Sequence, residues 1–249
     1  NIKVQTLKLE NNGLKKKKLK LVYYIKPVLE EDKLKSNGYC TLEFIPNSNV
    51  ICMKNTAQEE TFSQYLFVSS SEKITSYTGS KQNFVGNGGL ANPDGIRQIK
   101  LDNSNSLWQN GIIAIQCEVE LEALESKEIV FTLGVGKTVL ECQDIAYKYC
   151  NLSKVKEEYE KNKNYWRGIT DNLQVSTPLE STNILLNSWL IYQTITSRLL
   201  GRTGYYQSGG AYGFRDQLQD TIALKYVDPE FTKQQIIKHS AHQFIEGDV

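Results

Sequence analysis

The sequence has little of several features that would place it in a specialised class of protein. Its 29 basic and 28 acidic residues leave a formal net charge of +1, so no excess of positive charge favours nucleic acid as a partner. His239 and His242 are the only histidines. Because a metal site needs at least one further ligand, we interpret both as ordinary helix residues and expect no metal. No run of about 18 apolar residues occurs and the N-terminus lacks a signal-peptide pattern, so we expect no membrane partner.

The cysteines are few and form no recognisable metal or redox pattern. Cys40, Cys52, Cys117, Cys142 and Cys150 are odd in number and include no CxxC pair. This favours a reducing compartment, and therefore the cytoplasm, over a disulfide framework. Cys117 lies in an alternating stretch, where we expect it to act as a small buried apolar group.

Residues 1–148 carry the pattern of antiparallel strands. Apolar and polar residues alternate over 19–25 and 113–121, as in strands with one buried and one solvated face. Turn-forming GNGG and NPDG sequences occur within 86–95. Many short strands separated by such turns predict a β-sandwich domain over 1–148. We interpret the lysines at 15–18 as the solvated edge of a strand, where lysine discourages edge-to-edge pairing, and not as a nucleic-acid site.

The composition changes near residue 150, and the rest of the chain predicts helices. We expect a helical linker over 149–176, with a charged, exposed helix at 154–163 and an extended stretch from 169. A further helical domain is expected over 177–249. Because its helical part is too short to close a barrel alone, we expect the chain to be a truncated piece of a longer protein.

Two helix starts in the second domain have clear sequence signals. Thr177, Pro178 and Glu180 form the pattern of a capping box with proline at the first helical position. Asp228 and Pro229 repeat the cap and proline, and predict a helix that ends near Phe244. Between them, a third helix is expected over 215–226.

The segment from Gly204 to Asp220 is the most informative for chemistry. Its glycines let the backbone approach a ligand closely, and its aromatic residues supply flat apolar surfaces. Arg215 and Gln219, like Asp216 and Asp220, are four residues apart, so a helix would place them in a polar stripe, with Leu218 and Ile222 opposite. A pyranose needs such a mixture of carboxylate, guanidinium and aromatic groups. The alternative interpretation is an ordinary helix start with an internal Arg–Asp ion pair. The candidate ligand-binding residues are Arg215, Asp220, Asp216, Gln219, Tyr206, Gln207, Ser208 and Tyr212.

Three stretches resemble a known family. The sequence YQTITSRLLGRTGYYQSGGAYGFRDQLQD, followed by HQFIEGDV, is similar to phosphorylases of glycoside hydrolase family 94, and closest to the branch acting on β-1,2-glucans. The stretches SYTGSKQNFVGNGGLANPDGI and KEIVFTLGVG resemble the sandwich domain of that branch. The chain departs from the pattern at Ser80-Lys81, where the family has Asp-Arg, which is a sandwich position.

The resemblance implies a fold and a reaction. The fold is an antiparallel, supersandwich-like β-sandwich followed by a linker helix and the first helices of an (α/α)6 barrel. The reaction is inverting phosphorolysis of a β-glucosidic bond in a β-glucan oligosaccharide, giving α-glucose 1-phosphate, with inorganic phosphate as co-substrate and no cofactor. The resemblance assigns Arg215 and Asp220 to the non-reducing glucose and Asp216 and Gln219 to their support. Related phosphorylases are often dimers, so it also implies a homodimer.

The general acid of such a reaction is expected outside this chain, beyond Val249. Asp216 and Asp220 suit that role poorly, because a helix N-terminus and the neighbouring Arg215 favour an ionised carboxylate, whereas an acid catalyst must hold its proton. Glu246 and Asp248 either border the active site or lie at an exposed helix end. Two other functions stay open from the sequence: a non-catalytic carbohydrate-binding region, and an inverting β-glucoside hydrolase of a related helical-barrel clan.

Overall fold

The computed structural model describes residues 2–29, 39–57, 64–105, 111–201 and 214–248. The chain divides into two compact units, Asn1–Glu157 and Glu158–Val249, and the division falls within one long helix.

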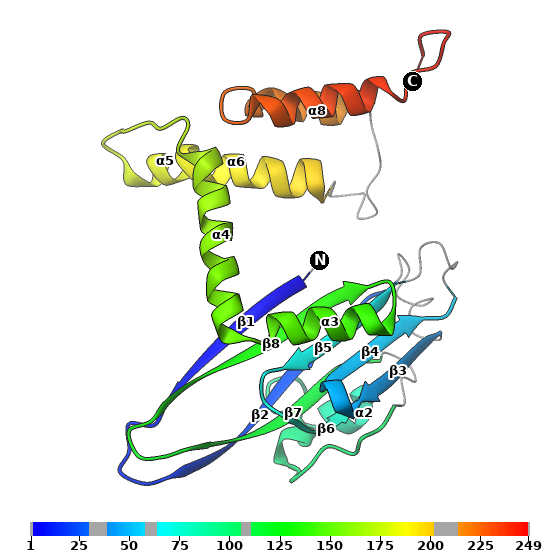
Figure 1. The fold of residues 1–249 in the computed structure, drawn as a ribbon, viewed down its shortest axis with the longest axis vertical. Coiled ribbons are helices and arrows are strands. Elements are labelled where there is room, and N and C mark those ends of the chain that lie inside the picture. The colour runs from blue at the N-terminus through cyan, green and yellow to red at the C-terminus, as the bar shows by residue number, and fades with distance from the viewer. Residues whose placement is uncertain (1, 30–38, 58–63, 106–110, 202–213, 249) are drawn as a thin grey trace. The chain divides into compact units, whose positions relative to one another are not determined.

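The first unit holds two antiparallel sheets (Figure 1). A five-stranded sheet has the order β1-β8-β5-β4-β3, and a three-stranded sheet has the order β2-β7-β6. The strands are β1 (Ile2–Glu10), β2 (Lys17–Ile25), β3 (Cys40–Ile45), β4 (Val50–Asn55), β5 (Tyr65–Ser70), β6 (Ile74–Thr78), β7 (Ile113–Leu121) and β8 (Ser126–Gly136). The prediction of an antiparallel β-sandwich is confirmed.

Apolar side chains from both sheets form the main core between them. Ile51 and Val68 of the larger sheet and Ile113, Ile115 and Cys117 of the smaller one are completely buried within it. Complete burial of a side chain the size of isoleucine contributes about 1.5–3 kcal/mol, so this interface makes a large contribution to the stability of the unit. Cys117 is buried as a small apolar group, as predicted.

Strand β7 is buried on both faces over its first half, whereas the sequence predicted one solvated face. Ala114 and Gln116, on the face away from the main core, are completely buried. The reason is a cover formed by the chain after β6, which contains α2 (Lys81–Val85) and η2 (Asp94–Arg97). Phe84 packs near Ala114, and the side-chain amide of Gln116 donates to the carbonyl of Ile99 at 2.8 Å.

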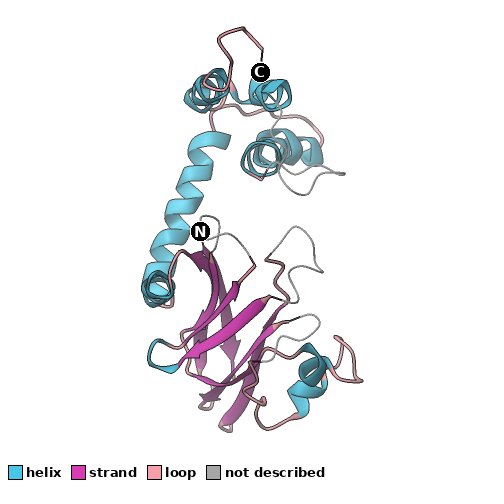
Figure 2. Cartoon of the chain, turned by 90° about the vertical axis from the view of Figure 1, so that its right-hand side faces the viewer, coloured by secondary structure: helices cyan, strands magenta, loops and turns pink. Residues whose placement is uncertain are grey.

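The outer face of the larger sheet is covered by α3 (Val139–Tyr149), a helix that the sequence interpretation of 1–148 as all β did not include. Thr138 caps it by accepting from the amide of Glu141. Cys142 and Ala146 of α3 pack on Cys52 of β4 and its neighbours. In Figure 2, α3 and the α2 segment flank the strands from opposite sides.

The lysine-rich start of β2 lies at a sheet edge, as predicted, because β2 is the outer strand of the three-stranded sheet and pairs with β7. Lys16 contacts Glu120 at 2.7 Å and Glu122 at 2.8 Å, and Lys18 contacts Glu120 at 2.6 Å. The charges are therefore balanced by the neighbouring strand in solvent.

The second unit is helical. Its elements, including the long helix that begins in the first unit, are α4 (Leu152–Thr170), α5 (Glu180–Ile184), the π-helical η3 (Leu185–Trp189), α6 (Leu190–Gln193), the π-helical η4 (Thr194–Leu200), α7 (Phe214–Thr221), η5 (Ile222–Leu224) and α8 (Pro229–Ser240). A small core joins α4, η4 and the segment after α7, and its buried members are Ile169, Ile195, Leu199, Leu224 and Val227. Among the described residues, none of the helices combines the length and apolar character needed to cross a bilayer.

Two details of the predicted helices are corrected. The helix expected at Thr177 begins at Glu180, because the Thr177 side chain interacts with Asn183 at 2.8 Å and does not cap the first turn. The stretch expected to be extended from 169 is still helical to Thr170. Ile184 and Leu200 of this region are exposed.

The start of α8 follows the prediction. Asp228 is the N-cap, and its carboxylate accepts from the amide of Phe231 at 2.9 Å, with Pro229 at the first helical position. The helix ends at Ser240, four residues before the predicted Phe244.

Candidate functional site

The polar candidates of the sequence lie on one short helix. Arg215, Asp216, Gln219 and Asp220 all belong to α7, so the predicted helical spacing is confirmed. The candidates Tyr206, Gln207, Ser208 and Tyr212 lie outside the described residues. The structure therefore places the four polar candidates on α7, and the role of the other four candidates stays a prediction.

The buried side of α7 differs from the prediction. Gln217 and Thr221 are buried, whereas Leu218 is half-buried and Ile222 is exposed. The hydroxyl of Thr221 donates to the carbonyl of Leu218 at 2.7 Å, and the Thr232 hydroxyl donates to the Thr221 carbonyl at 3.2 Å. Because the hydroxyl of Thr221 is satisfied by its own helix, this residue can occupy the packed face in place of an apolar side chain.

Helix α8 supports α7 from this side. The ring of Phe214, at the start of α7, meets the ring of His239 edge-on, with centroids 5.9 Å apart. His239 is buried, and its Nδ1 lies 2.7 Å from the Gln235 carbonyl. Within the described parts of the chain, no three His, Cys, Asp or Glu residues gather in a way that could hold a metal ion.

Arg215 extends into solvent. Its side chain is 87% exposed, and one Nη lies 3.6 Å from a carboxylate oxygen of Asp216, which is itself 64% exposed. An ion pair this long and this exposed contributes little to stability. The guanidinium is therefore available to a ligand. The alternative interpretation, an internal Arg–Asp ion pair that stabilises the helix start, corresponds here to a weak contact.

Asp220 is held more firmly, by an arginine that the sequence interpretation missed. The Nε of Arg198, on η4, donates to Oδ2 of Asp220 at 2.9 Å, and the Asp220 side chain is 25% exposed. The two residues are 22 positions apart on different helices, so no spacing rule connects them. One signal was present: Arg198 is the only charged residue between Glu180 and Arg202.

Glu246 and Asp248 lie in the chain after α8. Both are exposed, and the Asp248 carbonyl accepts from the amide of Phe244 at 2.9 Å. They occupy a turn and not the end of a helix, since α8 ends at Ser240.

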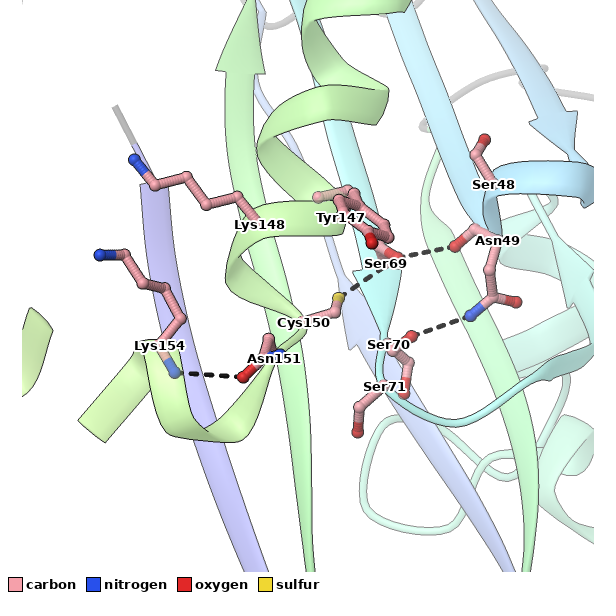
Figure 3. A pocket seen from close by; sticks show the side chains of 11 residues that line it. Ser48, Asn49, Ser69, Ser70, Ser71, Tyr147, Lys148, Cys150, Asn151 and Lys154 are labelled. Carbon is pink, nitrogen blue, oxygen red and sulfur yellow. Dashed lines mark hydrogen bonds between the residues drawn. The ribbon is translucent and has the colours of Figure 1, made fainter. Parts of the chain in front are cut away.

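A separate pocket of about 550 Å³ lies in the first unit, between the end of α3 and the larger sheet (Figure 3). It is lined by Ser48, Asn49, Ser69, Ser70, Ser71, Ala146, Tyr147, Lys148, Cys150, Asn151 and Lys154. Much of its polar surface serves the fold, because Ser69 donates to the Asn49 carbonyl at 2.7 Å and Asn49 donates to the Ser70 carbonyl at 2.8 Å. Burial raises the pKa of the Cys150 thiol, which therefore stays protonated and is a poor nucleophile at neutral pH.

Comparison with protein families covers almost the whole chain. Residues 1–152 match the family model described as the glycosyl hydrolase 94 supersandwich domain. Residues 165–249 match the model of the catalytic domain of the glycosyl hydrolase 94 superfamily. Helix α7 and its candidates lie within the second match.

Individual relatives point the same way. The chain is 28% identical over 249 residues, 99% of its length, to the cyclic β-(1,2)-glucan synthase NdvB of Rhizobium meliloti strain 1021. It is 23% identical over 251 aligned residues, also 99% of its length, to a solabiose phosphorylase of Paenibacillus borealis. It is 26% identical over 180 residues, 71% of its length, to an N,N'-diacetylchitobiose phosphorylase of Vibrio furnissii. The chain spans 9%, 32% and 22% of these proteins, respectively.

Proposed function

Because the chain belongs to glycosyl hydrolase family 94, we propose that it is the supersandwich domain and the first part of the catalytic domain of a glycoside phosphorylase. In this proposal residues 1–148 form the supersandwich, 149–176 the linker and 177–249 the beginning of the (α/α)6 barrel. The catalytic-domain match over 165–249 supports the last assignment.

The observation that carries the proposal is the polar stripe of α7. A solvent-exposed guanidinium on Arg215 and an oriented carboxylate on Asp220 come from one helix within the catalytic-domain match. A glucose ring presents adjacent hydroxyl groups, each of which both donates and accepts. A carboxylate accepts from such hydroxyls and a guanidinium donates to them, with stronger bonds than neutral groups make. Asp216 and Gln219 are proposed as supporting groups, and Tyr206, Gln207, Ser208 and Tyr212 as the remaining ligand contacts.

The proposed reaction breaks a β-glucosidic bond at its anomeric carbon. An oxygen of inorganic phosphate attacks that carbon from the opposite face, the leaving sugar oxygen takes a proton, and α-glucose 1-phosphate forms with inverted configuration. The reaction resembles that of an inverting hydrolase with phosphate in the place of water and its base. Neither a redox change nor a cofactor is needed. The proton donor is proposed to lie outside residues 1–249.

We propose a β-1,2-linked glucan oligosaccharide as the substrate. The support is the 28% identity over 99% of this chain to a protein named as a cyclic β-(1,2)-glucan synthase. Relatives named for other disaccharides match at 23% and 26% identity, so linkage is the part of the proposal that needs its own measurement.

The test uses the full-length protein. It is incubated with sophorose, the β-1,2-linked glucose disaccharide, and with β-1,2-oligoglucans, with and without phosphate. We expect α-glucose 1-phosphate to appear only with phosphate, with its configuration read by NMR. Cellobiose and laminaribiose are the linkage controls, and faster turnover of either would overturn the β-1,2 assignment. Glucose released without phosphate would indicate a hydrolase, and binding without any cleavage would indicate a carbohydrate-binding protein.

We also propose a cytoplasmic homodimer whose ligands are the glucan and phosphate, with neither nucleic acid nor membrane as partner. The buried thiols of Cys52, Cys117 and Cys142 are in keeping with a reducing compartment. Light scattering of the full-length protein, at concentrations from nanomolar to micromolar, checks the dimer.

A further inference from the structure

Arg198 and Asp220 form an ion pair between two helices of the second unit. The Arg198 Nε donates to Asp220 Oδ2 at 2.9 Å. The Arg198 side chain is 47% exposed and that of Asp220 is 25% exposed. This carboxylate therefore has one oxygen fixed by a charged donor, at a position that solvent still reaches.

The backbone on the arginine side of the pair is anchored. Ile195 and Leu199, which flank Arg198 on η4, are buried in the core of the unit together with Leu224 and Val227. η4 is π-helical, and short π-helical turns within helices are rare and are frequent at functional sites. The amide of Gly201 closes this turn by donating to the carbonyl of Thr196 at 2.8 Å.

The backbone on the aspartate side is anchored as well. Thr221, the next residue, is buried, and its carbonyl accepts from the hydroxyl of Thr232 on α8. Both backbones are therefore held by packed neighbours, which keeps the Arg198 side chain within reach of the Asp220 carboxylate.

We propose that Arg198 is a positioning residue for sugar binding: it fixes the orientation of the Asp220 carboxylate, so that this group meets the hydroxyl groups of the glucose ring without first losing rotational freedom. The inference rests on the proposed function of α7 as a sugar subsite. Arg198 acts through Asp220, whereas Arg215 is solvent-exposed and reaches the ligand directly. A carboxylate that is already oriented costs less entropy when a ligand binds.

The pair is not placed to matter much for stability. Ion pairs between partly exposed side chains contribute little to folding, because solvent screens them and two long side chains must be ordered. Loss of Arg198 should therefore weaken ligand binding without unfolding the protein. A merely structural role predicts the opposite.

The test is a double-mutant cycle in the full-length protein, with Arg198→Ala, Asp220→Ala and the variant carrying both. We expect Arg198→Ala to raise KM for sophorose and lower kcat/KM about 10- to 100-fold, the range for loss of a charge-assisted hydrogen bond. If Arg198 acts through Asp220, the double variant should be no worse than Asp220→Ala alone. Arg198→Lys, which keeps the charge but loses the planar guanidinium, should fall between Arg198→Ala and the wild type.

The matched control is Arg97→Ala. Arg97 is an exposed arginine 3.8 Å from Asp94 in the first unit, and we expect its loss to leave kcat/KM unchanged. Equal kcat/KM in Arg198→Ala and the wild type, or strictly additive losses in the double variant, would overturn the inference. So would a fall in Tm that accounts for the lost activity, with KM unchanged.

The binding of sophorose, measured by calorimetry, separates this inference from the proposed reaction. If the wild-type protein binds sophorose but forms no glucose 1-phosphate, the proposed reaction fails, and a Kd about 10-fold or more weaker in Arg198→Ala still supports the positioning role. If the wild-type protein neither binds nor cleaves sophorose, both proposals are overturned.

Discussion

The ring of Tyr23 on β2 stacks on the ring of Phe131 on β8, with centroids 4.9 Å apart and planes inclined by 6°. The two residues belong to different sheets, so this contact fastens one layer of the sandwich to the other. Phe131 is 6% exposed, and the hydroxyl of Tyr23 reaches the sheet surface, where it donates to the side-chain oxygen of Gln5 at 2.7 Å.

We expect Phe131→Ala to destabilise the sandwich by about 3–5 kcal/mol, since it removes a buried ring and leaves a cavity. A cycle with Tyr23→Leu and Phe131→Leu should show a coupling of about 0.5–1.5 kcal/mol, the contribution of a stacked pair beyond its buried area. Hydrogen exchange of the β2 and β8 amides measures the loss of stability in Phe131→Ala and the coupling in the cycle. Tyr147→Leu, at a tyrosine that is 88% exposed, is the control, and equal effects at the two sites would contradict the role of the stack.

Two glycines should respond to alanine with opposite signs. A Cβ at Gly136 would lie 2.9 Å from the Cys142 Sγ and 3.2 Å from its backbone nitrogen, so Gly136→Ala should push α3 away from the sheet and accelerate hydrogen exchange in α3. A Cβ at Gly168, within α4, would meet nothing within 4 Å, so Gly168→Ala should stabilise that helix by about 0.5–1 kcal/mol. Slower exchange in α3 of Gly136→Ala would refute the close approach.

The charged edge of β2 should make a small contribution to the stability of the sandwich that is lost in acid, because solvent screens exposed ion pairs. Hydrogen bonds from Lys16 and Lys18 lower the pKa of Glu120 from 4.5 to about 2. A carboxyl whose pKa is lower in the folded state stabilises the protein above its unfolded pKa, and this contribution disappears as pH falls from 4.5 towards 2. Urea midpoints of the wild type and Glu120→Gln should therefore differ at pH 6 and converge near pH 2. A constant difference across that range would show that Glu120 acts by other means.

Arg215 should matter for catalysis and not for folding. Within the part of the chain that the structure describes, its exposed side chain makes one ion pair, the 3.6 Å contact with Asp216. If it grips the glucose, Arg215→Ala in the full-length protein should lower kcat/KM by about 100-fold or more, from loss of one or two charge-assisted hydrogen bonds of about 1.5–3 kcal/mol each. Tm should stay within about 1–2 °C of the wild type, as for most exposed substitutions. Near-normal turnover with an intact fold would reject the subsite.

Local patterns predicted the strands well. The stretch predicted as a strand, 113–121, has the same bounds as β7, and the lysines at 15–18 mark a sheet edge. The burial of Gln116 could not be predicted from the strand pattern, because the segment that covers it lies elsewhere in the chain. The Gln116 side-chain amide donates to the carbonyl of Ile99, 17 residues earlier.

The predictions of helix boundaries were wrong where a second interaction competed with the local capping signal. Thr177 had the features of a cap, yet Asn183 engages its side chain and the helix begins later. Helix α3 had a usable signal in Thr138 and Glu141, a cap followed three residues later by an acid, but its position directly after a strand favoured an all-β interpretation.

The candidate site divides in the same way. The polar stripe could be predicted from spacing alone, because the helical repeat determines which residues of one helix share a face. The partner of Asp220 could not follow from spacing, since the contact with Arg198 depends on how two helices pack. An isolated charge in an otherwise uncharged helix, as at Arg198, is the clue that sequence patterns offer in such cases.

The π-turn at the end of η4 has a consequence for engineering this protein. A Cβ at Gly201 would lie 2.8 Å from the carbonyl oxygen of Thr196, the same oxygen that accepts the Gly201 amide. Even the smallest side chain there would strain the turn that carries Arg198. A mutagenesis library aimed at a new sugar specificity should therefore keep glycine at 201 and place its diversity on the exposed face of α7.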